Sequence, residues 1–148
     1  MSLFSVFKFM MPLVLATCIA GGVQASPTQA LSSLEAVTNM YEAGNYDETI
    51  ALLTDAVVTE PDNAAYHHLL AKSYGRSAQQ VSWLKAIEYA RKTRTHLEIA
   101  VKLEANNLVY LDDLMDYYLE APVFLGGSKR KADEIATRIS QLRQLSQI

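Results

Sequence analysis

Cysteine is almost absent from this 148-residue chain, whose single cysteine is Cys18, close to the N-terminus. A disulfide within the chain is therefore excluded, and beyond residue 25 no thiol is present that could act as a nucleophile or bind a metal. A basic excess is absent too, since the formal net charge is −3. Domains that bind nucleic acids usually carry a strong basic excess, so we expect no nucleic-acid partner.

Sequence motifs of catalysis are missing as well. The chain contains no GxSxG, HExxH or Walker-type segment, the patterns that position a serine nucleophile, a zinc ion or a phosphate. His67 and His68 are adjacent and would point about 100° apart on a helix, while His96 has no histidine or carboxylate four residues away. The densest carboxylate group, at residues 112–116, is of a kind also found on wet helix surfaces. We expect no enzyme activity, no cofactor and no metal site.

The first 25 residues have the layout of a secretory signal peptide. Lys8 precedes an apolar run at residues 9–20, and the small residues at 23–25 suit cleavage after Ala25. The apolar run is too short for a membrane-spanning helix. We therefore expect a signal peptide at 1–25, a domain at 26–148, no membrane span, and a periplasmic or secreted protein.

Cys18 leaves a second interpretation of this leader open. The segment from Leu15 to Cys18 resembles a bacterial lipobox, in which the cysteine becomes the lipidated first residue. The alternative to soluble export is therefore a lipoprotein component of an envelope assembly complex.

Proline and glycine are sparse, and strand-like alternation is not sustained anywhere. The chain has four prolines and six glycines, and its apolar residues recur at spacings of three and four, which is typical of amphipathic helices. The pattern predicts an all-α fold.

Residues 41–63 contain a more specific pattern. Gly44, Tyr46, Leu53, Ala56 and Pro61 stand at spacings that resemble the second half of a tetratricopeptide repeat. In that family, a glycine ends the first helix, an aromatic residue opens the second, an alanine permits close approach, and a proline ends the pair.

Two further units follow under this resemblance. The second runs from Ala64 to Asn107, about ten residues longer than the usual repeat, and we expect residues 77–90 to extend it into one long helix that ends near Glu104. The third consists of helices at 107–121 and 131–145 with an enlarged connection between them. The resemblance therefore implies a right-handed α-solenoid of about three antiparallel helix pairs.

In such repeats, certain positions of each first helix line a concave groove that binds a peptide or a partner helix. Among these positions, His68, Lys72 and Arg76 form a basic stripe, and Asp112, Asp116 and Glu120 form an acidic stripe. The two stripes would either pair with one another or bind a partner of mixed charge. The resemblance thus implies a non-catalytic protein-interaction module. The implied groove residues are Tyr41, His68, Lys72, Arg76, Asp112, Asp116, Leu119 and Glu120.

The connection APVFLGGSKRKA, residues 121–132, admits two interpretations. As a turn, it would use its glycine pair for the reversal, Ser128 as the N-cap of the last helix, and the apolar residues 123–125 as a hydrophobic plug. As a ligand site, Ser128, Lys129 and Arg130 would bind a small anion at the helix start.

Two sets of apolar residues complete the expectations. The aromatic residues Trp83, Tyr89, Tyr117 and Tyr118 are expected to pack between helices. The last helix carries an apolar stripe. Either another helix covers this stripe, or the stripe mediates self-association. That stripe consists of Ile135, Ile139, Leu142 and Leu145.

Overall fold

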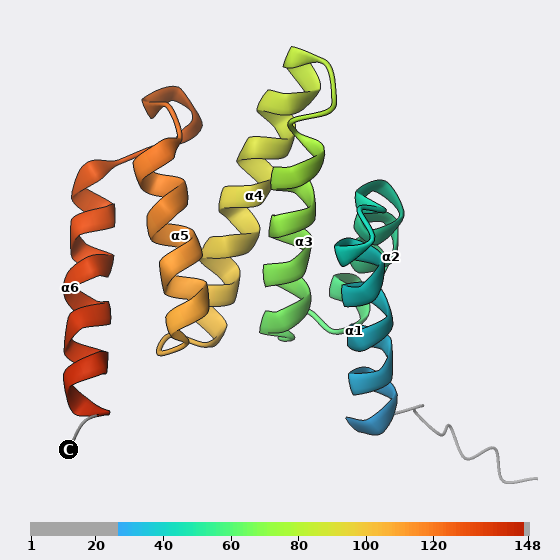
Figure 1. Cartoon of the computed structure of the whole chain (residues 1–148), viewed down its shortest axis with the longest axis horizontal. Coiled ribbons are helices and arrows are strands. Elements are labelled where there is room, and N and C mark those ends of the chain that lie inside the picture. Colours follow the sequence, from blue (N-terminus) through green and yellow to red (C-terminus); the bar gives the residue numbers. More distant parts are fainter. Residues whose placement is uncertain (1–26, 147–148) are drawn as a thin grey trace, which may run out of the picture.

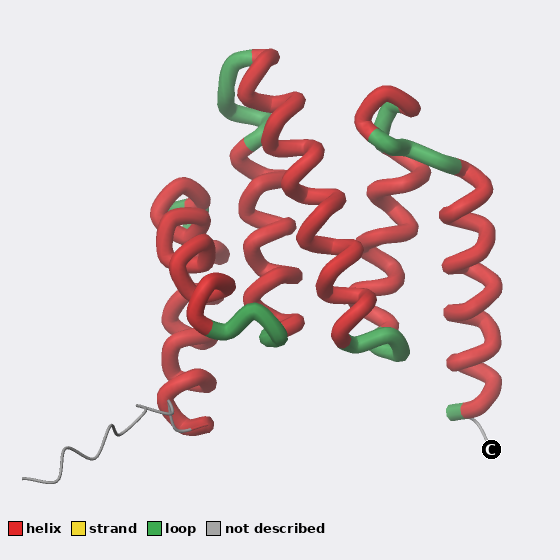
Figure 2. Tube along the Cα trace, turned by 180° about the vertical axis from the view of Figure 1, so that it is seen from behind, coloured by secondary structure: helices red, strands yellow, loops and turns green. Residues whose placement is uncertain are grey.

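The described part of the chain is entirely helical. The computed structural model describes residues 27–146, with side chains from residue 34 onward, and contains no strand in that range. The α-helices follow one another along a row, which Figures 1 and 2 show from opposite sides. The predicted all-α class is therefore confirmed, whereas the predicted signal peptide and Cys18 lie outside the described residues.

Each helix packs mainly against its neighbours in the sequence, and α1 also contacts α3. Between residues 27 and 146 no helix is both long enough and apolar enough to cross a membrane. The elements are α1 (Pro27–Glu42), α2 (Tyr46–Thr59), α3 (Ala64–Ser77), α4 (Trp83–Leu103), α5 (Leu108–Glu120), the 3-10 helix η1 (Val123–Leu125) and α6 (Lys129–Leu145).

Local capping explains where several helices begin and end. The side chains of Asn63, Asn107 and Ser128 accept hydrogen bonds from the first-turn amides of α3, α5 and α6, which satisfies donors that a helix start leaves unpaired. Gly44 follows α1 with a φ of 84°, a conformation that glycine adopts without a Cβ clash. The sequence thus sets most of the connections locally.

Small residues let the helices approach closely in the core. Ala71 and Ala100 have no exposed surface, and Ala132 is nearly as buried. Leu97 of α4 and Leu114 of α5 pack around Ala71 and Ala132. A second cluster joins α1 through α4 around Leu53, Leu70 and Tyr74.

The helix pairs α2–α3 and α4–α5 use the same residues at equivalent buried positions. Asn63 and Asn107, which cap α3 and α5, are 44 positions apart, and the same spacing relates a series of other side chains. Thr49 and Thr93 both donate a hydrogen bond to the carbonyl four residues earlier. The other matched pairs are Leu53 and Leu97, Tyr66 and Tyr110, Leu70 and Leu114, and Tyr74 and Tyr118, all of them buried.

The long helix differs from the expectation at its start. It ends at Leu103, close to the predicted end, but residues 78–82 form a turn and the helix begins only at Trp83. Ser82 has an extended ψ of 151°, so the helix cannot continue back through it. The expectation that Trp83 packs in the core is wrong, because Trp83 lies at this exposed helix start, whereas Tyr89 and Tyr118 are buried.

The hydrophobic plug predicted at 123–125 is also incorrect for two of its three residues. Val123 and Phe124 are exposed and only Leu125 is half-buried, because η1 projects beyond the ends of α5 and α6 (Figure 1). The apolar stripe of α6 is largely covered. Ile139 is buried and Ile135 packs against the cluster around Leu114, while Leu145 stays exposed.

Candidate functional site

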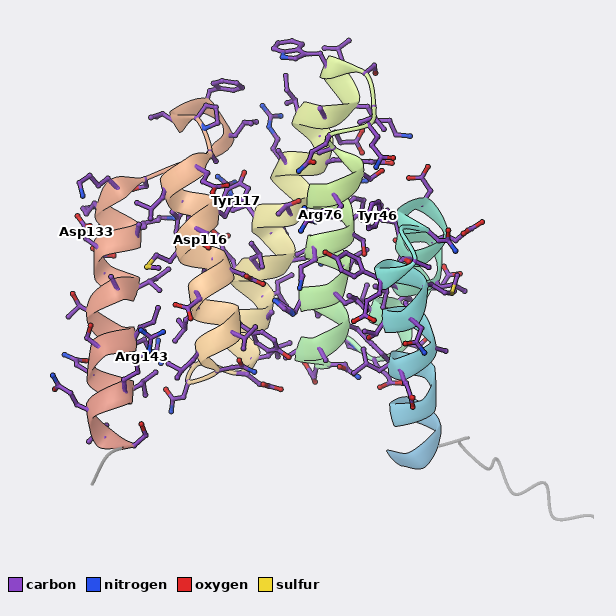
Figure 3. All side chains as sticks on the ribbon, viewed as in Figure 1. Tyr46, Arg76, Asp116, Tyr117, Asp133 and Arg143 are labelled. Atoms are coloured by element: carbon purple, nitrogen blue, oxygen red, sulfur yellow. The ribbon has the colours of Figure 1, made fainter. Side chains whose placement is uncertain are left out.

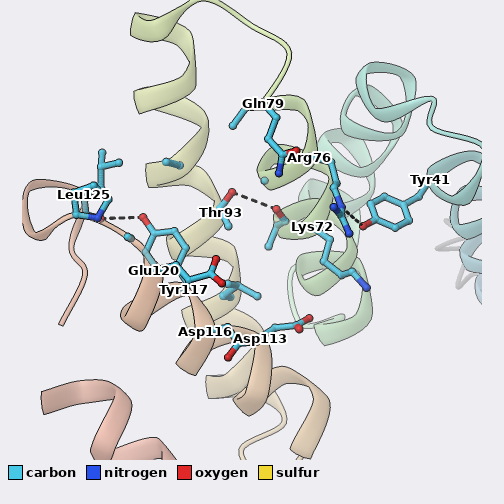
Figure 4. Close-up of a pocket in the computed structure, with 17 residues that line it drawn as sticks. Tyr41, Lys72, Arg76, Gln79, Thr93, Asp113, Asp116, Tyr117, Glu120 and Leu125 are labelled. Carbon is cyan, nitrogen blue, oxygen red and sulfur yellow. Dashed lines mark hydrogen bonds between the residues drawn. The ribbon is translucent and has the colours of Figure 1, made fainter. Parts of the chain in front are cut away.

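An open groove of about 410 Å³ lies between α3, α4 and α5. Figure 4 shows the residues that line it, among them Tyr41 of α1 and Leu125 of η1 at its two ends. Its floor is made by small and apolar residues of α3 and α4: Ala71, Gly75, Ala90 and Leu97. Gly75 contributes no side chain, and this keeps the floor open.

The wall on the α3 side carries two cations held by one tyrosine. The Nε of Arg76 donates a hydrogen bond to the hydroxyl of Tyr41 at 3.4 Å. The ammonium of Lys72 lies 5.4 Å from the centroid of the same ring, within the range of a cation–π interaction. Tyr41 therefore positions both cations at the groove.

The opposite wall carries carboxylates of α5. Asp113, Asp116 and Glu120 line the groove, a spacing that places them on one helix face. Asp112 does not line it and instead accepts a hydrogen bond from Arg143 of α6 at 3.3 Å. Figure 3 shows Asp116, Arg143 and Arg76 on their respective helices.

The two walls pair with each other at one point. Nε2 of His68 lies 2.6 Å from Oδ2 of Asp113, and this hydrogen bond is the main reason that the pKa of Asp113 is lowered. Among the ion pairs of the described side chains, none includes Lys72, Arg76, Asp116 or Glu120. Two cations and two carboxylates thus face a shared cavity without forming an ion pair.

Five of the eight predicted groove residues line this cavity: Tyr41, Lys72, Arg76, Asp116 and Glu120. His68 reaches it only through its bond to Asp113, while Asp112 and Leu119 lie outside it. The sequence reasoning missed Asp113, Thr93 and Tyr117. Asp113 could have been found by testing the neighbouring helix register, since Asp113, Asp116 and Glu120 also share a face.

The turn at 121–128 is fastened to the rest of the molecule at Leu125. The carbonyl of Leu125 accepts hydrogen bonds from the hydroxyl of Tyr117 at 3.0 Å and from Arg94 at 3.3 Å. Gly126 has a φ of 96°, a left-handed conformation that favours glycine, and a Cβ on Gly127 would collide with the Ala121 carbonyl. The turn therefore requires both glycines.

The basic residues after this turn are each placed beside an acidic side chain. Lys129 lies 3.3 Å from Asp133, and Arg130 pairs with Glu134 one turn along α6. Ser128 accepts its hydrogen bond from the amide of Lys131, at 3.4 Å, as an N-cap. The three residues predicted to form an anion site thus have partners within the chain.

A pair of stacked histidines joins α3 to α4 away from the groove. Nε2 of His67 lies 2.9 Å from the carbonyl of Pro61, and its Nδ1 lies 2.9 Å from Nδ1 of His96. Because a carbonyl can only accept, His67 carries its proton on Nε2 and accepts from His96 when neutral. Burial, the neighbouring His67 and Lys92 lower the pKa of His96 from 6.5 to about 4. Sequence reasoning missed this pair, and no local signal indicated it.

No group of three His, Cys, Asp or Glu side chains in the described part of the chain converges as metal ligands would. Comparison of the chain with models of protein families, with curated proteins and with solved structures found no match.

Proposed function

We propose that the protein is a non-catalytic interaction module that holds a short peptide segment of mixed charge in the groove between α3, α4 and α5. The observation that carries this proposal is the pair of facing walls, with Lys72 and Arg76 on one side and Asp116 and Glu120 on the other, none of them in an ion pair. A peptide with one basic and one acidic side chain would neutralise both walls at once.

The floor and ends of the groove suit such a segment. Ala71, Gly75 and Leu97 give an apolar floor for a small side chain, and Tyr41 provides a positioned aromatic ring at one end. An extended segment fits the proposal better than a helix, because the open volume of about 410 Å³ is modest.

We also propose that the six helices form three helix pairs of a tetratricopeptide-type solenoid with a right-handed sense. The support is the equivalence of α2–α3 and α4–α5, in which the caps and the buried tyrosines and leucines recur at matched positions. Lys72 and Asp116 are also matched, as are Arg76 and Glu120. Equivalent positions therefore carry opposite charges on the two walls.

On the expected signal peptide at residues 1–25, we further propose that the protein acts in the periplasm or outside the cell. The lipoprotein alternative through Cys18 predicts a lipidated protein that begins at residue 18 in place of Ser26. The mass of the mature protein isolated from cells distinguishes the two.

The groove proposal is tested by exchanging the charges of its walls. Short random peptides are selected on wild-type protein, and we expect the selected peptides to carry both a carboxylate and a cation. The variant Lys72→Glu/Arg76→Glu should lose roughly tenfold or more in affinity for them. Adding Asp116→Lys and Glu120→Lys should restore binding to peptides whose acidic and basic residues are exchanged.

Lys102→Glu is the matched control, because Lys102 is exposed on α4 and does not line the groove. It should leave peptide affinity unchanged. The proposal is wrong if selection yields uncharged peptides, or if the variant with all four charges reversed keeps the wild-type charge preference.

A further inference from the structure

Two connections of the chain project apolar side chains at the same edge of the molecule. Two connections lie at the top in Figure 1: the α3–α4 turn with the start of α4, and the connection that contains η1. The α1–α2 turn lies lower in this view. The large apolar residues there are exposed, by 71% for Trp83, 75% for Leu84, 86% for Val123 and 63% for Phe124. We call these four residues the tip edge.

The tip edge contributes little to the folded core. Its residues lie beyond the covered part of α4 and α5, and the partly buried neighbours Val81 and Leu125 make the contacts with the rest of the protein. Exposing a large apolar side chain to water is unfavourable, and clustered exposed apolar residues mark surfaces that bind something. Because these four come from two separate projecting connections, they form two points of contact and no continuous face.

The charged residues of the two connections themselves are basic, while Asp47, Glu88 and Glu120 lie beside them. Between Ser77 and Ile87 the only charged residue is Lys85, and between Ala121 and Ala132 the charged residues are all basic. Lys129 and Arg130 stand in the first turn of α6, where the helix dipole disfavours cations. Their partners Asp133 and Glu134 lie one turn further from the edge, and such exposed pairs are weak.

We propose that the tip edge docks on the surface of a lipid bilayer that contains anionic lipids. Trp83 and Phe124 would lie at the level of the headgroups with Leu84 and Val123, where aromatic and aliphatic side chains are favoured. Lys85, Lys129 and Arg130 would face the anionic headgroups. An anionic surface would also relieve the unfavourable position of the two cations at the start of α6. The groove and the tip edge share no residue, so this inference does not depend on the proposed function.

The chain supplies its own reporter, because Trp83 is its only tryptophan. The full protein as isolated from cells is mixed with vesicles of phosphatidylethanolamine and phosphatidylglycerol, or with vesicles of phosphatidylcholine alone. We expect the Trp83 emission to shift to the blue and to be quenched by brominated lipids in the first case only, with an effect that decreases as salt is added.

Moving the tryptophan separates tip contact from any other attachment, including a retained leader or a lipid on Cys18. Trp83→Phe/Phe124→Trp places the reporter in the second connection and should shift in the same way. Trp83→Phe/Val58→Trp places it on α2, where Val58 is 79% exposed, and should not shift. All these positions are exposed, and circular dichroism checks that each variant keeps its helices.

The contribution of charge is tested with Lys129→Gln/Arg130→Gln, which should weaken the vesicle affinity roughly tenfold, against Lys102→Gln as control. An unchanged Trp83 emission with anionic vesicles overturns the proposal. So does an equal shift at residue 58, which would indicate adsorption of the whole molecule, or an equal response to phosphatidylcholine. A protein partner that binds the tip edge while vesicles leave Trp83 unaffected would likewise replace the bilayer as its occupant.

Discussion

The turns that precede α3 and α5 are built with the same hydrogen bonds. In both, the amide of a glutamate bonds to the carbonyl of an alanine four residues earlier, Glu60 to Ala56 and Glu104 to Ala100. In both, an asparagine caps the next helix and donates its side-chain amide to that glutamate, at 3.1 Å for Asn63 and 2.9 Å for Asn107. The two turns are therefore locally equivalent.

The difference between them appears at the fourth residue of each helix. His67 occupies this position in α3 and Leu111 occupies it in α5, and both are buried. His67 bonds back to the Pro61 carbonyl of its own turn and across to His96, whereas Leu111 has only apolar contacts to offer. The same cap is therefore followed by a titratable junction in α3, the contacts of His67 with Pro61 and His96, and by an apolar junction in α5, the packing of Leu111.

The largest effect is expected from truncating Leu111, the buried apolar residue at the fourth position of α5. Leu111→Ala should lower the free energy of unfolding by about 2–5 kcal/mol, because Leu111 is almost fully buried and its removal leaves a cavity. Urea unfolding measures this, with Leu84→Ala at the exposed tip edge as the control, which should change stability by less than about 0.5 kcal/mol. Equal losses for the two variants would contradict the assigned core.

The titratable junction should make stability depend on pH. Because the pKa of His96 falls from 6.5 when unfolded to about 4 when folded, the unfolded chain binds an extra proton between these values. The free energy of unfolding should therefore be fully retained above pH 6.5 and decrease as the pH falls toward about 4. Urea midpoints measured across this window check the sign.

His96→Gln is the matched variant for this pH effect, since glutamine can still donate to His67 but does not titrate. It should remove most of the pH dependence between about 4 and 6.5, whereas Leu111→Ala should keep it. A full pH dependence in His96→Gln would show that other groups cause it.

Removing the shared caps should affect the two turns equally. Asn63→Ala and Asn107→Ala should each cost about 1 kcal/mol, since each leaves first-turn amides without their acceptor. Asn63→Asp and Asn107→Asp keep the acceptor and serve as controls. A marked difference between the two alanine variants in denaturant unfolding would contradict the equivalence of the turns.

The smallest effect is expected from the glutamates. Glu60→Gln and Glu104→Gln should each change the free energy of unfolding by less than about 0.5 kcal/mol, because the glutamine oxygen can still accept the hydrogen bond from asparagine. A cost above that of losing the cap itself would show that the carboxylate charge, and not the hydrogen bond, holds the turn.

Most of the helices could be predicted from the sequence because their signals are local. Gly44, Pro61 and the asparagine caps mark the connections, and the spacing of apolar residues marks the helices between them. Both walls of the groove could be predicted in part, because Lys72 and Arg76 lie one turn apart on α3 and Asp116 and Glu120 lie one turn apart on α5.

The remaining features depended on contacts between distant parts of the chain. Whether Asp112 or Asp113 faces the groove is decided by the packing of α5, whose buried residues Leu111, Leu114 and Tyr118 fix its rotation and leave Asp112 on the side of Arg143. Trp83 and Phe124 are large aromatic residues of a kind that is usually buried, but no neighbouring element covers their side chains, which stay exposed. The contact of His67 with His96 joins two helices and has no pattern in the sequence.

Gly75 gives the groove a depth that can be changed separately from the fold. A Cβ at this position would meet Thr93 at 3.7 and 3.8 Å, which are ordinary contacts, and alanine favours a helix by about 1 kcal/mol over glycine. A methyl group there would raise the groove floor without straining α3. Selectivity for the size of a bound side chain could therefore be engineered, or acquired in evolution, by a single substitution that also strengthens the scaffold.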